Sequence, residues 1–432
     1  MCAAHGAAYI KCFLCGRGAV AWSFLSNFAA FSSVRDGSSA RSADPRSGAD
    51  RRELRTARRR SRHAQIFCQK KVLIMLMQMA RTQPVIRPVR VWLWVGVVMI
   101  FMQVVIGGIT RLTGSGLSIT KWEIVTGALP PLSAAAWEDA FGLYRQTPQY
   151  HKINKGMTLG EFKFIFFWEY FHRLWARSLG FVFLLPFLWF WRRGQLPPWL
   201  MRRLGMTVLL GAVVATFGWI MVASGLVNRP WVNAYKLTLH LSLALLVFSH
   251  LIWTVFKSYN FVVLVIHSRV LKRFALWLLV VGGVQIMIGG VMSGMKAGLF
   301  YPTWPSMNGA FVPSALLEGS NWTLLNMELY DKHPFATGLV QFMHRGMAYL
   351  LLLMVLVYAW WVRKEHFHRA LRYANRLLYV AVFVQALLGI LTVVHCFGVV
   401  PVGLGVLHQA GALVLLGSLL FVNYQMRISK VA

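Results

Sequence analysis

Four histidines occur inside long apolar stretches of this 432-residue sequence, at His172, His240, His344 and His408. Placing an ionisable side chain within a membrane costs free energy, so each of these histidines is a candidate functional residue. Imidazole is a good ligand for iron, and helical bundles build metal and cofactor sites from inward-pointing side chains on facing helices. Two pairs of histidines could therefore each clamp one haem iron. The alternative for any single histidine is a core residue that hydrogen-bonds to a neighbouring carbonyl group.

One acidic residue, Glu169, lies in the same kind of apolar stretch. It precedes His172 by three positions and would share a helix face with it. Burial favours the neutral form of a carboxyl group, so Glu169 is a candidate proton donor or acceptor. The alternative is a structural hydrogen bond from protonated Glu169 to the backbone. Two arginines that directly follow histidines, Arg173 and Arg345, could pair with haem propionates or satisfy helix carbonyls.

The elements that carry these residues must be membrane helices. The sequence is 57% hydrophobic and only 13% charged, whereas about a quarter of the residues in a soluble domain are charged. Eight apolar runs are near or above the roughly 20 residues that cross a bilayer as a helix, the form that satisfies backbone polar groups internally. We predict an all-α membrane protein with eight transmembrane helices, at residues 91–109, 164–191, 206–226, 235–256, 274–292, 335–361, 377–397 and 401–424.

The charge pattern predicts how these spans are oriented. The formal net charge is +32, and outside the N-terminal region the positive charges lie mainly in short connections. Basic connections face the cytoplasm or the matrix, so both ends of the eight-helix body should lie on that inner side. This pattern points to topology and anionic lipid rather than to nucleic acid. The basic residues after the second, fourth and sixth spans are Arg192, Arg193, Arg202, Arg203, Lys257, Arg269, Lys272, Arg273, Arg363, Lys364, Arg369, Arg372 and Arg376.

The second half of the sequence resembles the first half. Residues 103–109 (QVVIGGI) resemble residues 285–291 (QIMIGGV), and residues 169–173 (EYFHR) resemble residues 341–345 (QFMHR). The sequence around His240 similarly matches the sequence around His408. An even number of helices separates the copies. We therefore predict two parallel four-helix repeats, residues 89–256 and 257–432, related by an axis along the membrane normal.

The repeat strengthens the haem prediction. His172 and His344 lie about eight or nine residues into their predicted helices, or roughly 12 to 14 Å along the axis. His240 and His408 lie about five to seven residues into theirs, at 1.5 Å per residue. All four helices begin on the outer side, so the imidazoles should share the outer half of the bilayer, two in each repeat. Matched depths in equivalent helices favour paired ligands over four independent core histidines.

The two repeats differ in one chemical respect. The residue that matches Glu169 is Gln341, and an amide cannot transfer a proton. We therefore expect the chemistry to occur in the first repeat.

Seven motifs occur in order: RLTGSGLS (111–118), PP (130–131), FIFFWEYFHR (164–173), NAYKLTLH (233–240), AGLFYPTWPSMNG (297–309), VQFMHR (340–345) and VLHQ (406–409). Together they resemble the haem A synthase family, from about residue 89 to the C-terminus. The resemblance implies oxidation of the C8 methyl group of haem O to a formyl group, which makes haem A for cytochrome c oxidase. It also implies that His172 and His240 hold the substrate haem, that Glu169 assists the chemistry, and that His344 and His408 ligate a resident haem b.

Some members of that family carry a cysteine pair in the first outer loop. Residues 111–163 contain no cysteine, so this sequence resembles the cysteine-free branch. The partners that the resemblance implies are haem O as substrate, haem O synthase, cytochrome oxidase assembly factors and a reductant such as a ferredoxin, with a homo-oligomer left open. The implied location is an inner membrane, with the bacterial cell favoured over the mitochondrion.

The N-terminal residues 1–80 lie outside this resemblance. They are rich in Arg, Ser and Ala, and we expect them to be disordered. A targeting peptide and a start codon assigned too far upstream both fit this composition. Four of the five cysteines lie here, in a pattern that predicts no disulfide framework.

Two other functions would keep the four histidines. A membrane cytochrome b that only passes electrons between two haems would need no Glu169. A haem transporter would use the histidines as transient ligands and would lose its haem on purification.

Overall fold

The computed structural model describes residues 84–120, 129–225, 230–259, 268–363 and 369–427. Within these ranges the regular structure is helical, as predicted for an all-α protein, apart from one isolated β-bridge between Met307 and Ala310. The predictions made for residues 1–80 lie outside the described residues.

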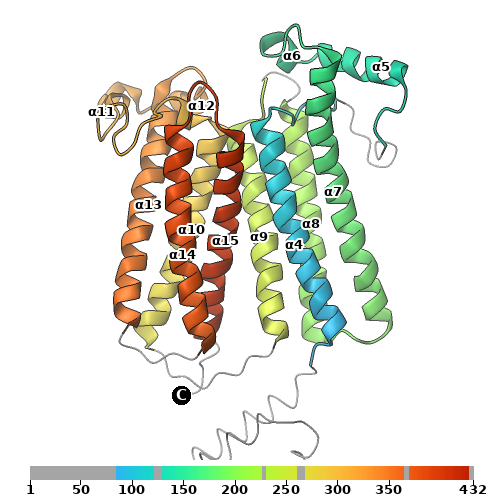
Figure 1. The fold of residues 1–432 in the computed structure, drawn as a ribbon, viewed down its shortest axis with the longest axis vertical. Helices are drawn as coiled ribbons and strands as arrows, with labels where there is room; N and C mark the ends of the chain where they lie inside the picture. Colours follow the sequence, from blue (N-terminus) through green and yellow to red (C-terminus); the bar gives the residue numbers. More distant parts are fainter. Residues whose placement is uncertain (1–83, 121–128, 226–229, 260–267, 364–368, 428–432) are drawn as a thin grey trace, which may run out of the picture. The chain divides into compact units, whose positions relative to one another are not determined.

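Eight helices in the described part of the chain are long and apolar enough to cross a membrane, which confirms the predicted number of spans. Figure 1 shows them side by side, with their axes running in the same general direction. They are α4 (Arg87–Leu112), α7 (Leu159–Arg192), α8 (Pro198–Gly225), α9 (Ala234–Ser258), α10 (Arg269–Gly294), α13 (Pro334–Val362), α14 (Arg369–Val394) and α15 (Val402–Arg427).

Several of these helices extend beyond the apolar runs that predicted them. Helix α7 begins at Leu159 rather than near residue 164, because Thr158 and Glu161 form a capping box in which the Glu161 carboxylate accepts from the Thr158 N–H at 2.8 Å. Helix α8 likewise begins at Pro198 rather than near residue 206. Hydropathy marks only the apolar part of a helix, whereas capping groups decide where the helix itself begins.

Four helices pack against one another in the middle of the bundle: α4 contacts α9 and α15, and α10 contacts the same two helices. Each of the other four packs mainly on one of these, with α7 on α4, α8 on α9, α13 on α10 and α14 on α15. The pairing of helices in the first half, α7 on α4 and α8 on α9, therefore matches the pairing in the second half, α13 on α10 and α14 on α15.

Residues of helix α15 belong to the two largest apolar clusters of the bundle. Leu413 and Leu416 join a cluster built mainly on α4 and α9, whereas Leu415 and Leu419 join a cluster on α10, α13 and α14. The two halves also meet where α10 ends on α9. A Cβ atom at Gly294 would lie 2.6 Å from the Ala234 Cα, so this contact requires glycine.

The two long connections carry short helices. Between α4 and α7 lie α5 (Ala134–Arg145) and α6 (Pro148–Lys152). Between α10 and α13 lie η3 (Ala297–Leu299), α11 (Ser314–Leu317), η4 (Gly319–Asn321) and α12 (Leu324–Glu328). Figure 1 places α5, α6, α11 and α12 at one end of the bundle, and α4 begins at the opposite end.

Candidate functional site

The four predicted histidines lie on four different helices: His172 on α7, His240 on α9, His344 on α13 and His408 on α15. All four side chains are half-buried. The structure brings them together in the two predicted pairs. The rings of His344 and His408 have their centres 6.4 Å apart and are inclined at 82°. His172 and His240 lie close enough to interact electrostatically.

The spacing of the second pair fits one metal ion between the two rings. Bonds from an imidazole nitrogen to a metal ion are about 2.0 to 2.1 Å long, so two rings on opposite sides of one ion have their centres roughly 6 Å apart. Elsewhere in the described residues, no three His, Cys, Asp or Glu side chains gather into a metal site. A pair that supplies only two ligands suits haem iron, whose remaining positions the porphyrin fills.

Each histidine ring packs directly against a glycine of a neighbouring helix. A Cβ atom added at Gly107, Gly218, Gly289 or Gly389 would lie 2.9 to 3.0 Å from the ring of His172, His240, His344 or His408, respectively. Real Cβ atoms rarely come so close to other atoms. The four glycines therefore leave room for the rings where helices cross: α4 with α7, α8 with α9, α10 with α13, and α14 with α15.

Three of these glycines are preceded, four positions earlier, by a glutamine that contacts the same histidine. The amide nitrogen of Gln103 lies 2.8 Å from His172 Nε2 and 3.3 Å from the His172 carbonyl oxygen. The corresponding distances for Gln285 and His344 are 3.4 and 3.0 Å. Gln385 lies 3.1 Å from His408 Nδ1 and donates to the His408 carbonyl at 2.9 Å.

The fourth histidine lacks such an amide. Four positions before Gly218 the chain has Val214, whose backbone His240 contacts, just as His344 and His408 contact the backbones of Gln285 and Gln385. The Nδ1 atom of His240 is buried and has no hydrogen-bond partner. The Nδ1 atom of His344 in the second half is likewise buried and has no hydrogen-bond partner.

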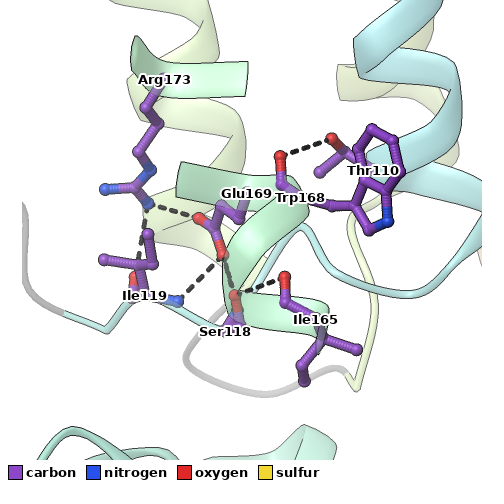
Figure 2. Close-up of polar contacts among 7 residues, drawn as sticks. All are labelled: Thr110, Ser118, Ile119, Ile165, Trp168, Glu169 and Arg173. Atoms are coloured by element: carbon purple, nitrogen blue, oxygen red, sulfur yellow. Dashed lines mark hydrogen bonds and ion pairs between the residues drawn. The ribbon is translucent and has the colours of Figure 1, made fainter. Parts of the chain in front are cut away.

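Glu169 is buried, with 3% of its surface exposed, but its surroundings are polar (Figure 2). Its Oε2 accepts from the Ser118 N–H and the Ser118 hydroxyl, both at 2.7 Å, and from the Ile119 N–H at 2.9 Å. Its Oε1 pairs with Arg173. Every one of these partners is a donor. The role of Glu169 as a proton donor or acceptor stays a prediction.

In the second half, the side chains at the equivalent positions donate hydrogen bonds to the loop, whereas Glu169 accepts them. The amide of Gln341, fully buried, donates to the Tyr301 carbonyl at 2.8 Å. Arg345 donates to the Tyr301 carbonyl at 3.0 Å and to the Thr303 carbonyl at 2.7 Å. Both halves thus tie the loop that follows their first helix to the helix that carries the first histidine. Only the first half does so with an acid.

Both arginines meet protein groups. Besides its ion pair with Glu169, Arg173 donates to the Ile119 carbonyl at 3.3 Å, and Arg345 meets the loop carbonyls described above. The sequence left open whether these arginines contact haem propionates or carbonyl groups, and the structure shows carbonyl contacts for Arg173 and for Arg345.

Three other histidines, which the sequence left as structural residues, have local partners in the structure. His333 caps α13 by accepting from the Phe335 N–H at 3.2 Å. His250 contacts the Arg203 carbonyl at 3.1 Å, and His395 contacts the Leu391 carbonyl at 2.8 Å.

The sequence interpretation missed the glutamine and glycine partners of the histidines, and it missed Ser118. The signal was present, because Gln-x-x-x-Gly occurs in three of the four helices that precede a histidine helix. Nothing local marks Ser118 as a partner of Glu169, since the contact joins separate segments of the chain.

The fold is that of a multi-pass membrane protein with two pairs of neighbouring imidazoles inside its helical bundle. Residues 90–420 match the profile of the family described as cytochrome oxidase assembly protein. The chain belongs to this family.

Relatives named heme A synthase are similar over most of their length. One from Bradyrhizobium sp. (strain ORS 278) is 45% identical over 332 residues, which cover 76% of this chain and 88% of the relative. One from Rhodopseudomonas palustris (strain BisB5) is 43% identical over 341 residues, covering 77% and 89%. One from Parvibaculum lavamentivorans is 43% identical over 327 residues, covering 76% and 91%.

Proposed function

We propose that this protein is a haem A synthase, an oxidoreductase that converts the C8 methyl group of haem O to a formyl group and so supplies haem A for cytochrome c oxidase. The observation that carries the proposal is the buried Glu169 carboxylate, one helical turn from His172, with Gln341 at the matching place in the other half. This asymmetry gives two similar imidazole pairs different chemistry. The relatives of the same family bear the same name.

The four-helix unit of residues 89–256 takes the substrate haem between His172 and His240. The unit of residues 257–432 holds a resident haem b between His344 and His408. The matched helix neighbours and the matched glycine contacts of the four histidines support two repeats. The 6.4 Å separation of the second ring pair supports a permanently ligated iron there.

The residues around Glu169 fix the position of its carboxyl group beside the first histidine pair. Haem iron, when bound, supplies the oxidising chemistry at the substrate. Ser118 and Ile119 occupy Oε2 with three donors, and Arg173 occupies Oε1, so the carboxylate is fixed in orientation before substrate arrives. Oxidation of a methyl carbon releases protons, and a positioned carboxylate can accept one as a general base. Arg173 stabilises the charge of the carboxylate between turnovers.

The protein acts in the inner membrane, with the bacterial cell membrane favoured by the bacterial relatives. The basic connections between α7 and α8, α9 and α10, and α13 and α14 face the inner side. The histidine pairs, which lie toward the end that carries α5, α6, α11 and α12, are then closer to the outer side. Haem O synthase, cytochrome oxidase assembly factors and a reductant such as a ferredoxin are its proposed partners, and it can form a homo-oligomer.

The experiment that tests this function is pigment extraction from cells that make haem O but lack a haem A synthase. Cells that express this chain should accumulate haem A, and cells that express the His172→Ala variant should accumulate haem O. An electron-transfer cytochrome would bind haem b but leave haem O unchanged in both strains. Haem O that persists in the presence of stable, haem-loaded wild-type protein would refute the proposal.

A further inference from the structure

An apolar groove lies between the two halves of the bundle, among helices α4, α9, α14 and α15. On α9 it begins at Phe248, eight residues past His240, and on α15 at Leu413, five residues past His408. These steps correspond to roughly 12 and 8 Å along a helix axis. The groove is therefore separate from the histidine pairs and lies toward the end of the bundle where α4 begins (Figure 1), which is the proposed inner side.

The shape of the groove fits a hydrocarbon chain that enters from the membrane. Its volume is about 510 Å³, within the roughly 300 to 1,000 Å³ of a typical ligand pocket. The side chains of Val97 and Phe248 in its floor are buried, whereas Val98 and Val414 at its edges are 56% and 44% exposed. Exposed apolar side chains on a membrane helix face lipid tails, so the groove is open to lipid.

The few polar groups along the groove already have partners within the protein. The Ser418 hydroxyl donates to the Val414 carbonyl at 2.8 Å. The Trp94 indole N–H donates to the Tyr259 hydroxyl at 3.0 Å. The groove itself therefore favours an apolar occupant over a polar one.

The inner end of the groove carries positive charge and aromatic rings on two helices. On α4, Arg90 lies one turn before Trp94, and its guanidinium is 5.0 Å from the centre of the Tyr259 ring. On α14, Arg369 lies 5.6 Å from the centre of the Tyr373 ring and donates to the Tyr373 hydroxyl at 3.2 Å. Tyr373 precedes the groove residue Leu377 by one turn. Tyrosine and tryptophan concentrate at the membrane–water interface, which places both arginines at the level of lipid headgroups.

We propose that this groove binds an acyl chain of an anionic phospholipid from the inner leaflet, and that Arg90 and Arg369 hold the phosphate of that lipid. The apolar lining and the open edges fit the chain, and the two positive charges at headgroup level fit the phosphate. Basic residues at the inner surface of a membrane attract anionic lipid. The bound chain packs against α4 and α9 of the first half and against α14 and α15 of the second half, so it fills the space between the halves. This site is independent of the proposed haem chemistry.

The test counts the lipid molecules that purified full-length protein retains, by native mass spectrometry, after addition of phosphatidylglycerol or of phosphatidylcholine with the same acyl chains. We expect one phosphatidylglycerol molecule to persist under conditions that remove phosphatidylcholine. Gly417→Leu should abolish this binding. A Cβ atom at Gly417 would lie 3.5 Å from Ile252 Cδ1, an ordinary contact, so the larger side chain fits the backbone and occupies the groove. Gly403→Leu on the same helix is the matched control, because a Cβ there meets nothing within 4 Å.

A second variant tests the charges without filling the groove. Arg90→Gln combined with Arg369→Gln should weaken phosphatidylglycerol binding by about fivefold for each charge removed and leave phosphatidylcholine binding unchanged. The matched control combines Arg193→Gln with Arg363→Gln. These two arginines also lie over aromatic rings, at the ends of α7 and α13, and have no place in the groove.

The arginine variants decide the matter if Gly417→Leu does not accumulate in the membrane. Equal retention of the two lipids by the unmodified protein would overturn the proposal, as would unchanged phosphatidylglycerol binding after removal of both groove arginines. Oligomers of the unmodified protein that carry no lipid and are lost in Gly417→Leu would also overturn it, because the groove would then be an interface between copies of this chain.

Discussion

Ser118 donates two hydrogen bonds to one oxygen of Glu169, from its backbone N–H and from its hydroxyl, each 2.7 Å long. The pair joins the loop after α4 to α7 (Figure 2), and Glu169 precedes His172 by three residues. This contact anchors the loop, and we expect the same carboxylate to take part in proton transfer, so the two roles need separate tests.

The first prediction concerns the titratable group. Glu169→Gln keeps the size of the side chain but removes the carboxylate, so haem A formation should fall by about 10² to 10⁴. The resident haem b should remain, because His344 and His408 are unaffected. Extracted pigments, normalised to membrane-bound protein, should show haem O or a partly oxidised haem. Normal haem A formation by a fully assembled variant would eliminate the catalytic role of Glu169.

The second prediction separates catalysis from loop anchoring. Ser118→Ala removes the hydroxyl donor but leaves the backbone N–H of residue 118 in place. A hydrogen bond to a charged group contributes about 1.5 to 3 kcal/mol, so the protein yield and the orientation of Glu169 should both suffer moderately. Haem A output per molecule should fall much less than in Glu169→Gln. If both variants lose the same activity and the same protein yield, anchoring of the loop is the main function of Glu169.

The third prediction tests the close packing of glycine on the ligands. In Gly289→Ala the new Cβ would lie 3.0 Å from the His344 ring, and the strain should cost about 1 to 3 kcal/mol and displace the imidazole. The haem b content of purified protein should fall. Gly283→Ala on the same helix is the matched control, because a Cβ there meets nothing within 4 Å. Equal haem content in the two variants would show that the close contact has no effect on the ligand.

The fourth prediction concerns the iron ligands of the second half. The purified protein should show a low-spin b-type absorption spectrum, because two neutral imidazoles provide a strong axial field. Either His344→Ala or His408→Ala should remove most of this signal. His395→Ala provides a comparison, since His395 contacts a helix carbonyl outside the pair. A full signal in both the His344→Ala and His408→Ala variants would contradict the assignment of haem b to this site.

The fifth prediction concerns topology. A reporter fused after Ala432 should lie on the inner side, and one inserted near Ser320, in η4, should lie on the outer side. Enzymatic reporters that are active on only one side of the membrane distinguish these cases. Two reporters on the same side would contradict the arrangement of eight spans.

The sequence determined the class of fold and the pairing of the four histidines. Hydropathy and helix length are local properties, and they were enough to predict eight spans. The internal similarity of the two halves was enough to pair His172 with His240 and His344 with His408, since equivalent helices should occupy equivalent places. Helices α7 and α8 begin several residues before the predicted apolar runs, and for α7 a capping box outside the run extends the helix.

Only the tertiary structure decided what surrounds these residues. Burial of Glu169 could be predicted from its apolar neighbours, but two of the residues that donate to it, Ser118 and Ile119, come from the loop after α4. The amide partners of the histidines likewise come from other helices, at positions fixed by how those helices cross. Sequence periodicity gives the face of a helix on which a residue lies, whereas packing between helices decides which hydrogen-bonding group that face meets.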